Sequence, residues 1–272
     1  PDPIELIENY GADGVRMGMM LCAPAGNDIL FDKSLCENGR NFCNKIWNAF
    51  RLVKQWPVCE EEQSRSNLKA AQWMNARIKV AAAEMDDLFK KYRLSEALMT
   101  IFKLFTDDFS GWYLEMVKPA YQKPIDRTTL DSTFDIFETL MKMLHPFMPF
   151  ITEELNSILF QGSEMVISRA WPKADESLID AKIEAAFDQA FAVVESVRGV
   201  RGRYNVSPAT KLSAVVSVDD AATEASVKDC MAIITELSGL SDLSVAVKAA
   251  KPKFSASAVV PGGELYIPLE GI

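Results

Sequence analysis

A single histidine, His145, stands in the segment LHPFMPFITEEL (144–155), a few residues before the adjacent carboxylates Glu153 and Glu154. A histidine near carboxylates could act as a general base, but nucleophilic catalysis also needs a nucleophile within reach and a group that orients the base. No G-x-S-x-G motif and no Cys–His signature accompanies it. Pro146 biases the residue before it away from helix, so we expect His145 to end one helix and the two glutamates to occupy the first turn of the next.

Other motifs for nucleotide, metal or redox chemistry are missing from the sequence. Neither G-x-x-x-x-G-K-[ST] nor G-x-G-x-x-G occurs. The five cysteines are an odd number without a C-x-x-C pair or a signal peptide before them, which favours reduced thiols in the cytoplasm. Cys36 and Cys43 are seven residues apart on one helical face, but the histidine is distant, so buried thiols are expected rather than a zinc site. We therefore expect no catalytic residue, no metal and no cofactor in this chain.

A polar helical face offers a different chemistry. Asn44, Asn48 and Arg51 recur at spacings of four and three, which places them on one side of a helix. Asparagine amides and arginine forks read unpaired base edges, while lysine and arginine hold phosphates. Arg40, Asn41 and Lys45 neighbour this face, and an exposed ring such as that of Trp47 could stack on an unstacked base. The alternative is the polar outer face of a bundle helix, with Trp47 in the apolar stripe.

A second basic segment is RGVRGRYNVSP (198–208), in which Arg198, Arg201 and Arg203 stand close together without an acidic residue. Glycines among them would let a partner's backbone approach. These arginines are candidate phosphate contacts; the alternative is a solvated helix end that faces an acidic neighbour.

Composition limits what these patterns can mean. The chain of 272 residues is 49% hydrophobic and 25% charged, as in an ordinary soluble protein, and is long enough for two domains or for one large domain with an appendage. No apolar run is long enough for a membrane span. A net charge of −9 argues against a protein that coats DNA or RNA in general. It leaves room for a local basic strip, which is what docking on one specific nucleic acid requires.

Hydrophobic periodicity predicts the elements that position these residues. Asp13 is expected to cap a short helix at 14–23, and Asp32 to cap the next. The long helices are expected at 33–56, 67–91, 94–117, 127–145 and 150–160, with Phe147, Met148 and Phe150 in the core. A helix at 179–203, strands at 211–218, 243–247, 255–260 and 263–269, and a helix at 219–238 are expected after them. The predicted fold is mainly α: an antiparallel helical bundle followed by a small α/β module.

Several segments closely resemble bacterial valyl-tRNA synthetases, a family of class I aminoacyl-tRNA synthetases, in the region after the catalytic KMSKS loop. The segments are YGADGVRMGMML (10–21), GNDILFD (26–32), NKIWNAFRLV (44–53), WYLEMVKP (112–119), LHPFMPFITEEL (144–155), AWP (170–172) and ELYIPLEGI (264–272). The segment at 144–155 is similar in the isoleucyl and leucyl enzymes, whereas GNDILFD, NKIWNA and PLEG are typical of the valyl enzymes. Asn156 departs from the family, which commonly has Trp there.

The resemblance implies a division into a stem-contact region at 1–45, an anticodon-binding helical bundle at 46–178, and an α/β module at 179–272 that leads to a C-terminal arm. It implies that Asn44 and Asn48 read anticodon bases, that Arg40, Lys45 and Arg51 contact phosphates or bases, and that Trp47 stacks or packs. Arg16 would face the tRNA stem or the catalytic domain.

The implied partners are valine tRNA, through its anticodon loop and stem, and the catalytic domain of the same enzyme, with no membrane and no DNA. HIGH-like and KMSKS signatures are absent, and the chain starts at PDPIELIENYGADGV without an initiator Met, as an excised piece would. ATP and magnesium would belong to the parent ligase, and this piece should be catalytically inactive. Alternatives are the same region of an isoleucyl or leucyl enzyme, or a helical scaffold that binds protein.

Overall fold

The computed structural model describes residues 2–22, 31–159, 164–173 and 181–269. The chain divides into two compact units, Pro1–Ile179 and Asp180–Ile272. The division lies next to the predicted start of the α/β module, whereas the predicted boundary at residue 45 lies inside a continuous helix.

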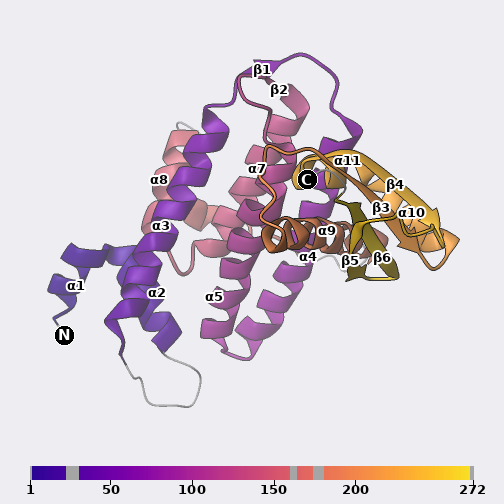
Figure 1. Ribbon diagram of the computed structural model, residues 1–272. Coiled ribbons are helices and arrows are strands. Elements are labelled where there is room, and N and C mark those ends of the chain that lie inside the picture. The colour runs from indigo at the N-terminus through magenta and orange to yellow at the C-terminus, as the bar shows by residue number, and fades with distance from the viewer. Residues whose placement is uncertain (1, 23–30, 160–163, 174–180, 270–272) are drawn as a thin grey trace. The chain divides into compact units, whose positions relative to one another are not determined.

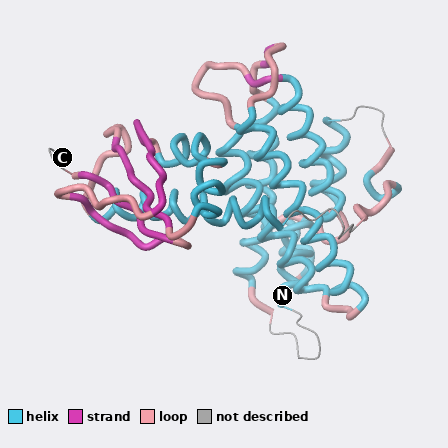
Figure 2. Tube along the Cα trace, turned by 90° about the vertical axis from the view of Figure 1, so that its right-hand side faces the viewer, coloured by secondary structure: helices cyan, strands magenta, loops and turns pink. Residues whose placement is uncertain are grey.

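The first unit is a helical bundle with one very short parallel strand pair (Figures 1 and 2). Its elements in chain order are α1 (Pro3–Tyr10), α2 (Ala12–Cys22), α3 (Lys33–Lys54), β1 (Val58–Cys59), α4 (Arg65–Lys90), α5 (Leu94–Lys103), η1 (Leu104–Tyr113), α6 (Leu114–Val117), β2 (Ile125–Asp126), α7 (Arg127–Leu144), α8 (Pro149–Leu159) and η2 (Val166–Ser168). The predicted bundle is thus confirmed, while α1 and the strand pair were not predicted.

Aromatic side chains form the centre of this unit, where α3, η1 and α7 meet. The rings of Phe42 and Phe105 lie 5.6 Å apart, those of Phe105 and Phe109 5.3 Å, and those of Phe109 and Phe137 5.8 Å. All four side chains are buried. Such edge-on and tilted ring pairs add to the free energy gained by burying apolar area, so they fix how α3 lies in the bundle.

Helices α2 and α3 cross closely because glycines remove side chains from the contact. A Cβ atom on Gly18 would lie 2.6 Å from the Cys36 Sγ atom and 2.8 Å from its backbone nitrogen. A Cβ atom on Gly39 would lie 2.6 Å from the carbonyl oxygen of Gly14. The crossing therefore fixes α3 against α2 through backbone contact.

The helix predicted at 94–117 is interrupted. Its middle, Leu104–Tyr113, is a π-helix between α5 and α6. Phe105, Phe109 and Tyr113 stand four residues apart and are all buried there, and Gly111 lies within the same turns. A π-helix is rare and depends on tertiary packing, so apolar periodicity alone does not reveal it.

The corner at 144–155 is held from α2. His145 follows the last residue of α7 as its cap, which confirms that prediction. Asp13 is buried within α2 rather than capping it: its carboxylate accepts from the backbone N–H groups of Phe150 and Ile151, at 3.3 and 2.7 Å, in the first turn of α8. Arg16 donates to carbonyl oxygens of the turn that follows α7, at 2.9 Å to Phe147 and 3.0 Å to Pro146. We call this pair of residues the Asp13–Arg16 clamp.

Two predictions about this corner were wrong. Glu153 and Glu154 lie beyond the first turn of α8, because the helix already begins at Pro149, a residue that suits the first helical position. Glu153 instead accepts from the backbone N–H groups of Val166 and Ile167. Phe150 is 63% exposed, whereas Phe147 and Met148 are buried as expected. The carboxylate at the start of α8 comes from Asp13, a residue distant in sequence.

The second unit is a sheet with helices, which confirms the small α/β module (Figures 1 and 2). Its elements are α9 (Ala181–Arg203), β3 (Leu212–Val218), α10 (Ala221–Asp229), α11 (Met231–Ser238), β4 (Leu240–Val247), β5 (Ser255–Val260) and β6 (Gly263–Pro268). The strand order is β4-β3-β6-β5, with β3 and β4 parallel and the other pairs antiparallel. The helix predicted at 219–238 breaks at Cys230.

The five cysteines have free thiols: Cys22, Cys36 and Cys230 are buried, and Cys43 and Cys59 are half-buried. Burial raises the pKa of Cys43 to about 12, which leaves its thiol protonated and unreactive at neutral pH. Within the described ranges no helix has the length and apolar character that a bilayer crossing needs, and no group of three or more His, Cys, Asp or Glu side chains could hold a metal.

Candidate RNA-binding surfaces

Helix α3 has a polar side that faces solvent. The residue that caps the helix and the residues that it buries determine which side this is. Asp32 caps the helix by accepting from the Ser34 backbone N–H at 2.8 Å, and the hydrogen bonds to Ser34 lower the pKa of that aspartate. Seven side chains or glycines of α3 are buried: Cys36, Gly39, Phe42, Ile46, Ala49, Phe50 and Val53. They follow helical spacing, so the residues on the opposite side must face solvent.

Three of the predicted RNA contacts come together on this outward side. Asn44, Asn48 and Arg51 are all exposed and have no hydrogen-bond or ion-pair partner among the described residues. They follow one another at a rise of about 6 and 4.5 Å along the helix. We call these three residues the α3 polar face. Two amides and a guanidinium with all their donors open can bind base edges and phosphates.

The other three predicted residues on α3 lie at the flanks and have intramolecular contacts. Arg40 donates to the Asn9 carbonyl and to Glu37, each at 3.4 Å, and its guanidinium lies 5.7 Å from the Tyr10 ring. Lys45 donates to the Thr106 carbonyl at 3.4 Å but stays exposed. A phosphate could replace these long, exposed hydrogen bonds.

Trp47 is half-buried, and its ring lies 6.0 Å from the Phe50 ring in a tilted pair. The sequence left two roles open for Trp47, stacking on a base and packing in the protein. This geometry favours packing.

In the second unit, the three arginines of α9 differ from one another. Arg201 is buried, and its guanidinium donates to the carbonyl oxygens of Ser207 at 3.1 Å, Thr210 at 2.9 Å and Gly239 at 3.0 Å. This geometry gives Arg201 a structural role: it ties the end of α9 to the next loop and to the end of α11. The arginine fork is unavailable to a phosphate in this conformation.

The flanking arginines remain at the surface. Arg198 is exposed and donates to the Leu237 carbonyl at 3.2 Å. Arg203 is exposed at the last position of α9. Gly199 and Gly202 have nothing within 4 Å of the place where a Cβ atom would be, so a partner's backbone could approach between these arginines. Arg198 also lines a surface pocket of about 670 Å³ beside the end of α11.

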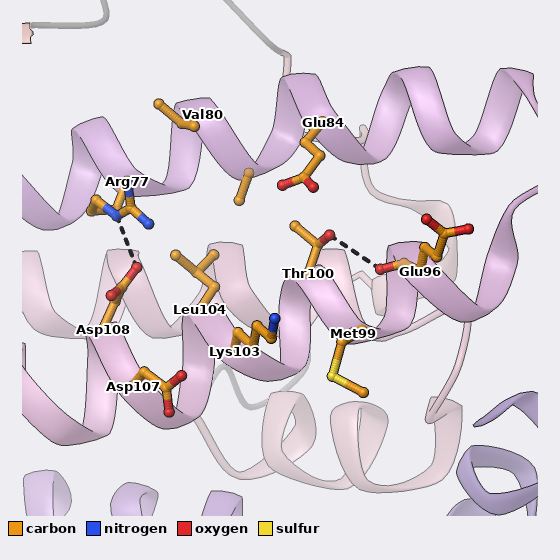
Figure 3. Close-up of a pocket in the computed structure, with 11 residues that line it drawn as sticks. Arg77, Val80, Glu84, Glu96, Met99, Thr100, Lys103, Leu104, Asp107 and Asp108 are labelled. Atoms are coloured by element: carbon orange, nitrogen blue, oxygen red, sulfur yellow. Dashed lines mark hydrogen bonds and ion pairs between the residues drawn. The ribbon is translucent and has the colours of Figure 1, made fainter.

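Sequence reasoning missed a pocket of about 500 Å³ between α4 and the α5–η1 segment (Figure 3). Arg77 from α4 bonds to Asp108 of η1 at 2.9 Å. The charged lining residues are Arg77, Glu84, Glu96, Lys103, Asp107 and Asp108. Because carboxylates outnumber the cations, this pocket repels phosphate, although carboxylate oxygens could accept from amino groups. The lining residues form no recognisable motif in the sequence, so only the folded structure reveals this pocket.

The sequence matches a known protein family over about half of its length. Residues 71–216 match the family described as the anticodon-binding domain of tRNA ligase. This range includes the arginines of α9 and begins after α3.

Curated relatives match almost the whole chain. The valine–tRNA ligase of Bacteroides thetaiotaomicron is 45% identical over 99% of this chain, which corresponds to 30% of the relative. That of Phocaeicola vulgatus is 48% identical over 99% of this chain and 30% of the relative. That of Porphyromonas gingivalis is 53% identical over 78% of this chain and 24% of the relative. The chain thus spans less than a third of the length of these relatives.

A solved structure, titled as the ternary complex of Agrobacterium radiobacter K84 agnB2 LeuRS-tRNA-LeuAMS, has a TM-score of 0.49 and 18% identity over 67% of this chain and 22% of that chain. This likeness is too low to support an argument.

Proposed function

The chain belongs to the family of anticodon-binding domains of tRNA ligases, and on this premise we propose that it binds valine tRNA as part of a valine–tRNA ligase. The observation that supports the proposal most strongly is the α3 polar face, whose three side chains are exposed and have no partner among the described residues. Its two amides and guanidinium offer donors for base edges and phosphates from one side of one helix.

We assign roles to the residues by their chemistry. Asn44 and Asn48 read base edges of the anticodon, and Arg51 binds a phosphate or a base at the same side of α3. Arg40 and Lys45 contact phosphates from the flanks. Arg198 and Arg203 bind phosphates of the same tRNA.

The activity of the whole ligase is part of the proposal. The ligase joins valine to its tRNA with ATP and magnesium, and the groups that do this lie in the part of the relatives that this chain does not span. The matched share of 24–30% of the relatives leaves ample length for such a catalytic domain, which this chain would contact.

A tRNA titration tests the proposal. The chain is mixed with valine tRNA, with the same tRNA carrying a swapped anticodon, and with an unrelated tRNA, at several salt concentrations. We expect affinity to fall steeply with salt because bound counterions are released, and to fall further when the anticodon changes. Binding is measured by filter retention or by fluorescence anisotropy.

The outcomes separate the alternatives. Equal affinity for all three RNAs would remove the anticodon assignment. If isoleucine or leucine tRNA is used as the unrelated tRNA and binds most tightly, the chain is assigned to that ligase instead. Absence of salt-sensitive RNA binding, together with capture of a protein partner, would favour a helical interaction scaffold.

A further inference from the structure

We infer that the surface pocket beside His145 is a binding site for a phosphate group of the RNA backbone. The inference rests on the proposed function, because it assigns this phosphate to the same tRNA. The pocket has a volume of about 430 Å³ and lies where α2, α7, α8 and the segment after η2 meet. Its lining residues include none of the α3 polar face.

Cations line this pocket, and carboxylates do not. Arg16, Lys142 and Arg169 contribute permanent positive charge, with His145 and Trp171 beside them, and no Asp or Glu is among the described lining residues. This composition is the reverse of the acidic pocket between α4 and α5–η1. A dianion or a phosphodiester would enter a site that already provides opposite charge.

Lys142 and Arg16 keep N–H donors free for a ligand, although a carboxylate lies nearby. Glu138 accepts from Lys142 at 2.8 Å and from Arg169 at 2.6 Å, which holds both cations at the rim. An ammonium group has three donors, and this contact uses one of those of Lys142. Arg16 uses its Nε and Nη2 atoms in the Asp13–Arg16 clamp, and its Nη1 atom has no partner among the described residues. The clamp therefore fixes a guanidinium with an open N–H edge at the pocket.

The hydrogen bonds around His145 favour one tautomer of its ring. Thr152 has one hydroxyl proton, which it donates to the carbonyl of Met148 at 2.9 Å or of Pro149 at 3.1 Å. With that proton on a carbonyl, the Thr152 oxygen accepts from the Nδ1–H of His145 at 2.8 Å, the tautomer that satisfies both contacts. The Nε2 atom of the neutral ring is left as a bare acceptor, 3.9 Å from a Glu153 oxygen.

A bound phosphate would change the protonation of this ring. Burial lowers the pKa of His145, partly offset by Glu153 and Asp13, so the ring is neutral at pH 7. A phosphate beside Nε2 favours the protonated form, which then offers a further N–H donor. The charged groups around the ring from every packed element are Asp13, Arg16, Glu138, Lys142, Glu153 and Arg169. Backbone or ion-pair contacts hold these groups in place. The bound anion is therefore the charge whose presence or absence changes the pKa of His145.

The chain offers a direct probe, because His145 is its single histidine. The imidazole signals in a nuclear magnetic resonance spectrum of the 272-residue chain report on this pocket without further assignment. We expect inorganic phosphate to move these signals in a saturable way and to raise the titration midpoint of the ring by about one pH unit, while chloride at equal ionic strength does not. Valine tRNA should move the same signals, and phosphate should compete with it.

A matched pair of lysine variants tests the site in the RNA complex. Lys142→Gln should weaken valine tRNA affinity about 3–10-fold and lower the salt slope by about one, because one phosphate contact is lost. Lys90→Gln, at an exposed lysine near the end of α4, is the control and should leave both unchanged. Thermal unfolding of each variant shows whether the fold is preserved. Arg169→Lys keeps the charge and gives a second reading if Lys142→Gln is unstable; it should retain the phosphate response.

Each remaining result overturns the inference. If phosphate leaves the His145 signals in place, the pocket is no anion site. If valine tRNA binds without moving those signals, the pocket is not used, although the proposed function stands. If phosphate binds at His145 but no tRNA binds at all, the RNA assignment and the proposed function both fail.

Discussion

Helices α3 and α9 have similar residues and present them in opposite ways. In α3, Arg51 faces solvent, and Gly39 lies against the backbone of α2. In α9, Arg201 is buried among carbonyl oxygens, and Gly199 has open space around it. The arginine thus faces solvent in α3 and packs in α9, whereas the glycine packs in α3 and has open space in α9; the neighbouring elements decide which. A basic segment identified in sequence is therefore a candidate until its burial is known.

The largest test of this comparison is Arg201→Gln. Three carbonyl oxygens would lose their charged donor, so we expect the free energy of unfolding of the second unit to fall by about 2–4 kcal/mol. Chemical denaturation measures it, with Arg203→Gln as the control. If Arg201→Gln left stability intact but weakened tRNA binding, the buried arginine would be a recognition residue and the contrast between the helices would disappear.

Substitution of one glycine in each helix tests how tightly α3 and α9 are packed at these positions. Gly39→Ala places a Cβ atom 2.6 Å from a backbone oxygen of Gly14, so α2 and α3 must separate, at a cost of about 2–3 kcal/mol. Gly199→Ala meets nothing within 4 Å and should stabilise α9 by about 0.5–1 kcal/mol, since alanine is the better helix former. Thermal unfolding compares them. Equal effects of the two substitutions would contradict the described α2–α3 crossing.

For RNA recognition by α3, we predict that substitutions of an asparagine and of a lysine change tRNA binding in different ways. Asn48→Ala should reduce discrimination between the correct and swapped anticodon by about 1–2 kcal/mol, with little change in salt dependence, because an amide reads bases. Lys45→Ala should weaken all tRNAs alike and lower the salt slope by about one. Filter binding across salt concentrations separates the two. Indistinguishable variants would refute this division of roles.

The smallest effect is expected for Arg203→Gln. An exposed arginine at a helix end contributes little to folding, so stability should change by less than about 0.5 kcal/mol. One lost phosphate contact should lower the salt slope by about one. A slope that matched the unsubstituted chain would remove Arg203 from the interface.

Much of the fold was predictable because apolar periodicity encodes helix faces. The stripe of α3, its Asp32 cap, and the end of α7 at His145 all follow from local sequence. The π-helix at Leu104–Tyr113 does not, since it depends on how buried rings pack. Asp13 was assigned to its own helix because local capping is common, and only the fold shows that it serves α8.

The candidate sites show the same limit. Spacing along one helix was sufficient to place Asn44, Asn48 and Arg51 together. It could not show that Arg201 turns inward, since its carbonyl partners come from separate segments. The pocket beside His145 is built from four segments and left no pattern in the sequence.

The Asp13–Arg16 clamp has a consequence for the order of synthesis. Its partners lie 130 to 138 residues later in the chain, so α2 leaves the ribosome long before the corner that it holds. At typical elongation rates this delay is on the order of ten seconds. During that time α2 can already pack on α3, while the Asp13 carboxylate has only water as a partner. The clamp can close only after the turn that follows α7 and the start of α8 have emerged.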